Sequence, residues 1–180
     1  MKTINSRLVM PVLLLVAGAS FAFAAPRRAA PDAQTMNEVR KQLVTLPYYG
    51  VFDNLAYQLD GDTVTLSGQV VRPMTRKDAE RRVARVEGVR TVVNNIEVLP
   101  VSQFDDSIRV RTYRAVFRSG SLYRYARGAN PSIHIIVNRG RVTLEGVVSA
   151  RMDAQLAYMA ARGVPGVFSV TNNLRIEGRS

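Results

Sequence analysis

Arginine and tyrosine side chains gather between Arg109 and Arg127, where they could bind anions at the edge of an apolar surface. From Ser107 to Leu144 the chain contains no Asp or Glu, yet it carries eight arginines. Guanidinium groups form paired hydrogen bonds with phosphate oxygens, and tyrosine rings favour the headgroup level of a bilayer. The candidate lipid- or anion-binding residues are Arg109, Arg111, Arg114, Arg118, Tyr123, Arg124, Tyr125 and Arg127.

The spacing of these arginines predicts one charged face on a helix. Arg111, Arg114 and Arg118 fall on the same side of a 3.6-residue period, and Ile108 and Val116 fall on another. The alternative is a solvated basic face, with the tyrosines packing a loop that is longer than its counterpart earlier in the chain. Both interpretations stay open at this stage.

Two further helical segments present candidate surfaces. The first is basic outside its apolar face, and its charged residues are Arg76, Lys77, Arg81, Arg82 and Arg85. The second, later in the chain, instead shows Leu156, Tyr158 and Met159. This partly apolar face is a candidate for docking on a partner, on lipid or on the neighbouring module.

The residue types that most enzymes and metal sites need are missing. The chain has no Cys, and His134 is its only histidine. A lone His without nearby Cys or clustered carboxylates forms neither a usual zinc site nor a nucleophile–base pair. We therefore expect a structural or surface role for His134, no catalytic residue, no metal, no cofactor and no enzymatic activity.

The N-terminal 24 residues have the pattern of a signal peptide. Lys2 and Arg7 precede an apolar run from Leu8 to Phe23, and Ala22-Phe23-Ala24 supplies the small residues of a cleavage site. The run is short for a membrane-spanning helix, which needs about 20 apolar residues. We expect cleavage after Ala24 and an exported protein without a transmembrane anchor.

Cleavage lowers the formal net charge from +11 to +9, because it removes Lys2 and Arg7. A chain this basic is attracted to anionic phospholipid or other envelope surfaces. The bland alternative is that the charge only keeps the protein soluble. The charge is compatible with nucleic acid binding, but export argues against nucleic acid as a partner.

A repeat organises the chain. At an offset of 78 residues, Val64-Thr-Leu-Ser-Gly68 falls on Val142-Thr-Leu-Glu-Gly146, and Gly88-Val89 falls on Gly166-Val167. Over residues 55–98 and 133–176 the two copies align without a gap, and 13 of 44 pairs are identical. Most identities are apolar residues, Gly or Asn, which determine packing and turns. The sequence therefore predicts two tandem copies of one structural unit.

Each copy has the pattern of the same five elements. Alternating apolar residues predict two strands joined by a tight turn, at Asp60-Gly61-Asp62 in the first copy and at Asn138-Arg139-Gly140 in the second. A helix follows, with Thr75 or Asp153 as its predicted cap and Gly88 or Gly166 as its predicted left-handed stop. A last strand covers residues 91–98 or 169–176. The helices upstream of the hairpins are predicted at 35–46 and 107–118.

These elements predict an α+β fold of two modules in the order α-β-β-α-β. A right-handed crossover joins parallel strands, while the hairpin is antiparallel. Each module should therefore be a three-stranded mixed sheet with two helices on one face. The expected division is a signal peptide (1–24), a flexible linker (25–34), a first domain (35–100), a linker (101–104) and a second domain (105–177).

The order of these motifs resembles the BON domain, a module of exported bacterial proteins. The resemblance rests on Val64-Thr-Leu-Ser-Gly68, Gly88-Val89 and Val93-Asn-Asn-Ile96 in the first copy. In the second copy it is stronger, and the matching segments are Pro131-Ser-Ile-His-Ile-Ile-Val137, Arg141-Val-Thr-Leu-Glu-Gly146 and Val164-Pro-Gly-Val-Phe-Ser-Val-Thr-Asn-Asn-Leu174.

The resemblance implies a non-enzymatic, often periplasmic envelope protein. Such a protein binds phospholipid membranes, supports envelope integrity under stress, or assists the folding of other envelope proteins. The chain has no cysteine to acylate, so we expect a soluble form rather than a lipoprotein. The leading hypothesis is association with anionic phospholipid or envelope surfaces. The alternative is a chaperone-like adaptor that binds envelope protein clients.

Overall fold

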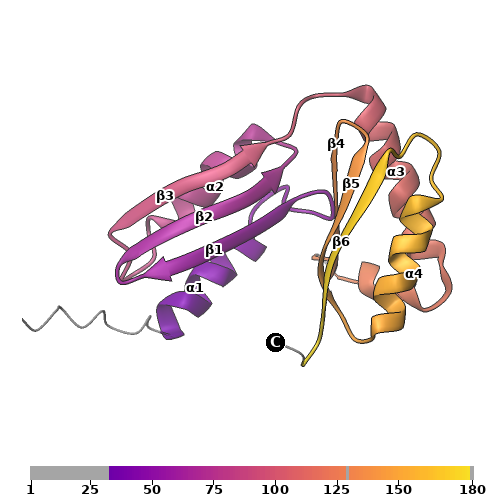
Figure 1. The fold of residues 1–180 in the computed structure, drawn as a ribbon. Coiled ribbons are helices and arrows are strands. Elements are labelled where there is room, and N and C mark those ends of the chain that lie inside the picture. Colours follow the sequence, from indigo (N-terminus) through magenta and orange to yellow (C-terminus); the bar gives the residue numbers. More distant parts are fainter. Residues whose placement is uncertain (1–32, 129, 179–180) are drawn as a thin grey trace, which may run out of the picture.

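A computed structural model of the chain describes residues 33–128 and 130–178, which form two three-stranded sheets (Figure 1). The predicted signal peptide and its cleavage site lie outside the described residues. Within the described residues, no helix is both long enough and apolar enough to cross a membrane. The predicted α+β class with two tandem modules is confirmed.

The first module has its central strand antiparallel to one neighbour and parallel to the other. Its elements are α1 (Ala33–Val44), β1 (Asn54–Asp60), β2 (Thr63–Val70), α2 (Pro73–Val83) and β3 (Thr91–Val98). The sheet order is β1-β2-β3, and both helices lie on the same face (Figure 1). Val64, Leu66 and Val70 alternate along β2 and are fully buried beneath them.

The second module repeats this topology and adds one short helix. Its elements are α3 (Gln103–Arg118), the 3-10 helix η1 (Gly120–Ala126), β4 (Ile133–Asn138), β5 (Arg141–Val148), α4 (Arg151–Arg162) and β6 (Ser169–Ile176). The sheet order is β4-β5-β6. Leu122 of η1 is fully buried in the core of this module, so the longer loop of the second copy has its own packing role.

Two glycines allow the central strands to approach their antiparallel neighbours closely. Gly68 and Gly146 have φ angles of +116° and +119°, in the region that side chains disfavour. A Cβ at Gly68 would clash with the carbonyl oxygen of Asn54, and one at Gly146 would clash with that of Ser132. Close backbone approach therefore explains why both strands carry glycine at this position.

The predicted helix caps at Thr75 and Asp153 are wrong. The helix α2 begins at Pro73 with Arg72 at the cap position, since proline at the first position is preorganised for a helix. Thr75 therefore lies within the helix and is fully buried. The cap position of α4 is Ala150. Asp153 instead binds side chains of η1.

The helix α3 begins earlier than the predicted residue 107, because Ser102 caps it. The Ser102 hydroxyl accepts a hydrogen bond from the backbone nitrogen of Asp105 at 3.2 Å. This bond satisfies one of the free N–H groups of the first turn. The extra turn places Phe104 and Asp105 on the helix, beside the β4–β5 turn.

The segment from Tyr49 to Asp53, between α1 and β1, packs against the second module. The backbone nitrogen of Ile135 in β4 donates to the carbonyl oxygen of Val51 at 2.7 Å. The Phe52 ring packs edge-on against Tyr113, with 6.3 Å between the ring centroids. Val51 and Phe52 also pack against the core of the second module. The first module thus covers part of the outer edge of β4.

Candidate functional site

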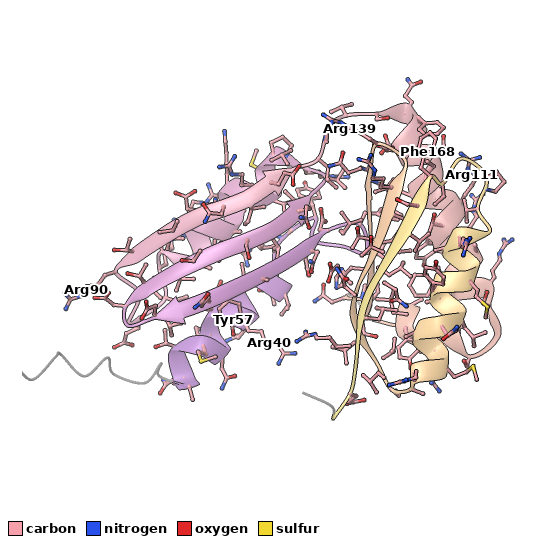
Figure 2. All side chains as sticks on the ribbon, in the orientation of Figure 1. Arg40, Tyr57, Arg90, Arg111, Arg139 and Phe168 are labelled. Carbon is pink, nitrogen blue, oxygen red and sulfur yellow. The ribbon has the colours of Figure 1, made fainter. Side chains whose placement is uncertain are left out.

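An exposed pair of phenylalanines flanked by arginines lies at one end of the second module. We call Phe104, Arg111, Arg139 and Phe168 the second tip. Figure 2 shows Arg111, Arg139 and Phe168 together at this end, contributed by α3, the β4–β5 turn and the loop before β6. Phe168 is 78% exposed and Phe104 is 49% exposed. Large aromatic side chains with this exposure mark candidate interaction surfaces.

A buried carboxylate holds the β4–β5 turn in place. Asp105 is almost completely buried, and its oxygens accept hydrogen bonds from the backbone nitrogens of Arg139 and Gly140, both at 2.8 Å. Arg139 and Gly140 have φ angles of +52° and +73°, as a tight hairpin turn requires. The fixed turn leaves the Arg139 side chain exposed.

The absence of a side chain at Gly140 makes room for the Phe168 ring. A Cβ at Gly140 would clash with that ring and would lie 3.4 Å from Phe104. The backbone nitrogen of Phe168 donates to the Gly140 carbonyl at 2.9 Å. Both rings therefore lie close to the empty side-chain position of one glycine and form a small apolar cap.

The predicted arginine face of α3 is present. Arg111, Arg114 and Arg118 are exposed, and no ion pair involves them within the described residues. Arg111 also reaches the second tip, because its guanidinium would lie 3.7 Å from a Cβ at Gly166. Uncompensated positive charge thus extends from the tip along α3.

Arg109 and Tyr125 do not belong to this surface. Arg109 is only 3% exposed, pairs with Asp106 and donates to the Val137 carbonyl at 2.8 Å. Tyr125 is buried, and its hydroxyl donates to Asp153 at 2.6 Å. Burial of both side chains removes them from any contact with a membrane or partner.

The three remaining residues of the predicted stretch, Tyr123, Arg124 and Arg127, are exposed but have different partners. Arg124 pairs with Asp153 and lies over the Tyr125 ring, so its charge is largely compensated. The hydrogen bond from Tyr125 lowers the pKa of Asp153, and bonds from Ser121 and Arg124 add to this effect. Tyr123 is exposed, with the guanidinium of Arg127 at 6.0 Å from its ring centroid.

The second basic face, on α2, is partly neutralised. Arg81 pairs with Asp78, and Arg82 donates to the Thr45 carbonyl at 3.2 Å. Arg76 lies near the Asn94 carbonyl, while Lys77 and Arg85 are exposed. This face therefore carries less free positive charge than its sequence indicates.

The apolar residues of α4 lie away from the first module. The helix packs on the face of the second sheet opposite to the first module (Figure 1). Leu156 and Tyr158 are half-buried, and Leu156 packs against the core of the second module. Met159 is exposed. Contacts between the modules come instead from other residues, among them residues 49–53 with α3 and β4, and Val44, whose carbonyl accepts a hydrogen bond from Asn130 at 2.7 Å.

The only histidine lies at the junction of the modules. The Nδ1 atom of His134 lies 3.3 Å from the Gly50 carbonyl oxygen, and its ring centroid lies 5.5 Å from that of Tyr49. Burial lowers the pKa of His134 and raises the pKa of Tyr49 to about 12. Burial also raises the pKa of Asp53, although its oxygens accept two backbone hydrogen bonds. His134 has a structural role here.

Sequence reasoning missed Phe104 and Phe168, although the repeat contains a signal for Phe168. At the 78-residue offset, Phe168 corresponds to Arg90 and Gly140 corresponds to Asp62. An aromatic residue that replaces a charged one at a loop position indicates a changed surface. Phe104 has no such signal, because its counterpart lies before the first predicted helix.

The architecture defines a tandem α+β protein with two copies of one module. In the described ranges, no group of three or more His, Cys, Asp or Glu side chains could hold a metal ion. The family model of the BON domain matches residues 31–100 and 105–178. This chain therefore belongs to the BON domain family, whose members are generally non-enzymatic envelope proteins.

Searches for similar proteins add two distant structures. No curated protein matches the sequence. The C-terminal domain of CdsD, a structural protein of the type III secretion system of Chlamydia trachomatis, is 9% identical with a TM-score of 0.33, and the match covers 82% of this chain and 99% of that one. A second CdsD structure is 9% identical with a TM-score of 0.31, covering 81% and 94%.

Proposed function

We propose that this chain is an exported, non-enzymatic protein that associates with anionic phospholipid at an envelope surface. The second tip and the arginine face of α3 form the contact. The observation that carries this proposal is the exposed pair of phenylalanines beside arginines that form no ion pair with any residue that the structure describes. Apolar rings enter the boundary between headgroups and acyl chains, and each nearby cation adds about 1 kcal/mol at an anionic surface.

Co-sedimentation with liposomes tests this function. The mature chain, residues 25–180, should pellet with vesicles that contain phosphatidylglycerol and remain in solution with pure phosphatidylcholine. The triple variant R111E/R114E/R118E should lose most of this binding. The matched control R76E/K77E/R85E makes the same charge change on α2 and the turn after it, and should retain this binding. Equal loss of vesicle binding in both variants would show that binding depends only on the net charge of the chain, and would contradict the proposed surface.

Export is part of the same proposal. The sequence pattern supports a periplasmic protein cleaved after Ala24, and BON domain proteins are usually periplasmic. N-terminal sequencing of the protein recovered from osmotic-shock fluid should begin at Ala25. Retention of the intact N-terminus in the cytosolic fraction would contradict this proposal.

The second candidate function is chaperone-like binding of envelope protein clients, favoured by exposed methionines on α4. Met152 and Met159 are both more than half exposed, and flexible methionine side chains suit varied apolar partners. M152Q/M159Q should then abolish protection of an aggregating client without lipid. Leu156 is unsuitable for this test because it packs against the core.

A further inference from the structure

A groove of about 680 Å³ runs along the outer edge of β1, between α1 and the β6 strand of the second module. This volume lies within the range of about 300–1,000 Å³ that is usual for binding sites. Residues 55–59 all line the groove. Since successive side chains of a strand point to opposite faces, a wall of consecutive residues is the edge of the strand. Tyr57 and Arg40 mark this edge in Figure 2.

The hairpin geometry shows which peptide groups of β1 face the groove. The β1–β2 hairpin closes on the pair Asp60 and Thr63 across a two-residue turn. The closing residues of such a hairpin bond each other, and bonded pairs alternate along an antiparallel ladder. The residues between these pairs, Leu55, Tyr57 and Leu59, therefore direct their N–H and C=O groups outward.

The equivalent groups of the second module are already bound. At the 78-residue offset, Tyr57 corresponds to Ile135 and Leu59 to Val137. The Ile135 nitrogen donates to Val51, and the Val137 carbonyl accepts from Arg109. On β1, no hydrogen bond from another described residue reaches the outward groups of Tyr57 and Leu59. The turn at residues 50–53 thus covers one of the two equivalent edges, while the outward groups of Tyr57 and Leu59 on the other have no partner among the described residues.

The side chains around this edge combine an apolar wall with two cations. Met36, Leu43 and Val44 of α1 line the groove, and the Tyr57 hydroxyl donates to the Met36 carbonyl at 2.8 Å. Two arginines flank this wall, Arg40 from α1 and Arg175 from β6. Neither forms an ion pair within the part of the chain that the structure describes. The groove is therefore complementary to a group that is both apolar and anionic.

We propose that the outer edge of β1 binds an extended peptide of a partner protein by strand addition. Main-chain hydrogen bonds to Tyr57 and Leu59 hold the peptide, as in other recognition by an added strand. A carboxylate of the peptide lies between Arg40 and Arg175, and an apolar side chain packs on Met36. This site lies on different elements from the membrane contact and does not depend on it.

The segment of this chain that precedes α1 is poorly suited to the groove. Residues 25–32 carry two arginines and one aspartate, so their net charge repels the two arginines of the groove. A carboxylate at the end of a partner chain, or an acidic side chain next to an apolar one, meets the requirement instead.

A defined peptide tests the proposal without lipid. The probe is a fluorescein-labelled octapeptide of alternating valine and threonine that ends in leucine with a free carboxylate. Fluorescence anisotropy should show saturable binding to the mature chain. R40E and R175E should each weaken Kd by at least about tenfold, because each replaces a charge-assisted hydrogen bond by repulsion. The control R90E, which changes an exposed arginine far from the groove, should leave Kd unchanged.

Two modified probes separate the contributions. The same peptide with a C-terminal amide should bind about tenfold more weakly, and methylation of alternate backbone nitrogens should abolish binding. Binding that is unaffected by either modification, or absence of binding by the unmodified peptide, would overturn the proposal. Thermal unfolding of R40E and R175E, both at exposed positions, checks that the variants remain folded.

Two other occupants are also outcomes of the test. Sedimentation that shows a dimer, dissociated by R40E or R175E, would assign the edge to a second copy of the chain and overturn the proposal. Dodecyl phosphate below its micelle concentration offers an anion and an apolar tail without peptide groups. Binding of this amphiphile with the same arginine dependence, in the absence of peptide binding, would also overturn it.

Discussion

The two modules have the same sheet topology but differ at the loops at one end of each sheet. In the first module, Arg90 forms an exposed ion pair with Asp62, with 3.2 Å between nitrogen and oxygen. In the second, Phe168 and Gly140 occupy the same positions of the repeat, and the ring is exposed. Figure 2 shows Arg90 and Phe168 at separate ends of the molecule. Both modules thus have the turn, but the surface beside it is polar in the first module and aromatic in the second.

A second difference lies inside the helices that follow the hairpins. Thr75 and Asp153 are equivalent and both buried. The Thr75 hydroxyl has no hydrogen-bond partner within the described residues, whereas Asp153 binds Tyr125, Ser121 and Arg124. The added 3-10 helix of the second module supplies all three partners. The 3-10 helix of the second module therefore makes this buried position the centre of a polar network.

The largest expected effect comes from the feature that the modules share. G68A and G146A should each destabilise their own module by about 3 kcal/mol, because the new Cβ combines backbone strain with a clash. Hydrogen exchange of the β2 and β5 amides after each substitution measures this effect. Loss of protection in both modules from either variant would show one cooperative unit, and would contradict the proposed division into domains 35–100 and 105–177.

The next effect should separate the modules. D153A should cost about 2 kcal/mol, since it leaves the buried Tyr125 hydroxyl without its acceptor and removes the bonds from Ser121 and Arg124. T75V should change stability by less than about 0.5 kcal/mol, because the hydroxyl it removes forms no hydrogen bond with the described residues. Urea unfolding of the two variants checks both values. Similar losses of unfolding free energy in D153A and T75V would contradict the proposed difference between the two buried positions.

The pH dependence of D153A provides an independent check on that network. Hydrogen bonds hold the pKa of Asp153 below its usual range, so its contribution is present above the unfolded aspartate pKa of about 3.9. It is lost as the pH falls through the lower pKa of the folded state. The difference in stability between the native chain and D153A should therefore shrink only in strong acid.

An exchange of the tip residues should alter membrane binding by a smaller amount. F168R should weaken binding to phosphatidylglycerol vesicles by about fivefold, because the loss of one inserted ring exceeds the gain of about 1 kcal/mol from the added cation. R90F should strengthen it, because it gives the first module an aromatic tip. Vesicle titration of both variants, with a lipid-free sedimentation control for aggregation, measures the exchange. Weakened binding by both variants would show that the tips are not equivalent sites.

The smallest expected effect concerns the junction between the modules. Burial lowers the pKa of His134, so its contribution to stability is present above the unfolded pKa of about 6.5 and is lost as the pH falls through the folded pKa. Unfolding between pH 7.5 and 5.5 should show a loss below the one-proton limit of about 1.4 kcal/mol per pH unit. H134Q should remove this dependence.

Nearby carboxyl groups oppose the effect at the junction. Asp53 and Glu145 favour the charged histidine. The raised pKa of Asp53 gives a contribution that is present below its unfolded value of about 3.9 and is lost as the pH rises through its folded pKa. The pH profile of D53N should therefore show the contribution of His134 without that of Asp53. A pH profile that H134Q leaves unchanged would contradict the assignment to His134.

Several features of the candidate surface could be predicted from the sequence. The 3.6-residue spacing placed Arg111, Arg114 and Arg118 on one exposed face, as the structure shows. The same spacing could not separate Arg109 from them, because a long arginine side chain can turn inward when a carbonyl and a carboxylate receive it. Val137 and Asp106 provide those partners, and Val137 comes from a distant strand.

The sequence by itself determined the repeated topology. Alternating apolar residues, tight-turn glycines and crossover helices are local signals, and their recurrence after 78 residues required the same sheet twice. Only the tertiary structure decided which side chains remained at the surface. Phe104 and Phe168 meet at Gly140, and the outer edge of β1 stays accessible while Val51 covers that of β4. These outcomes depend on contacts between segments far apart in the chain, which local periodicity does not encode.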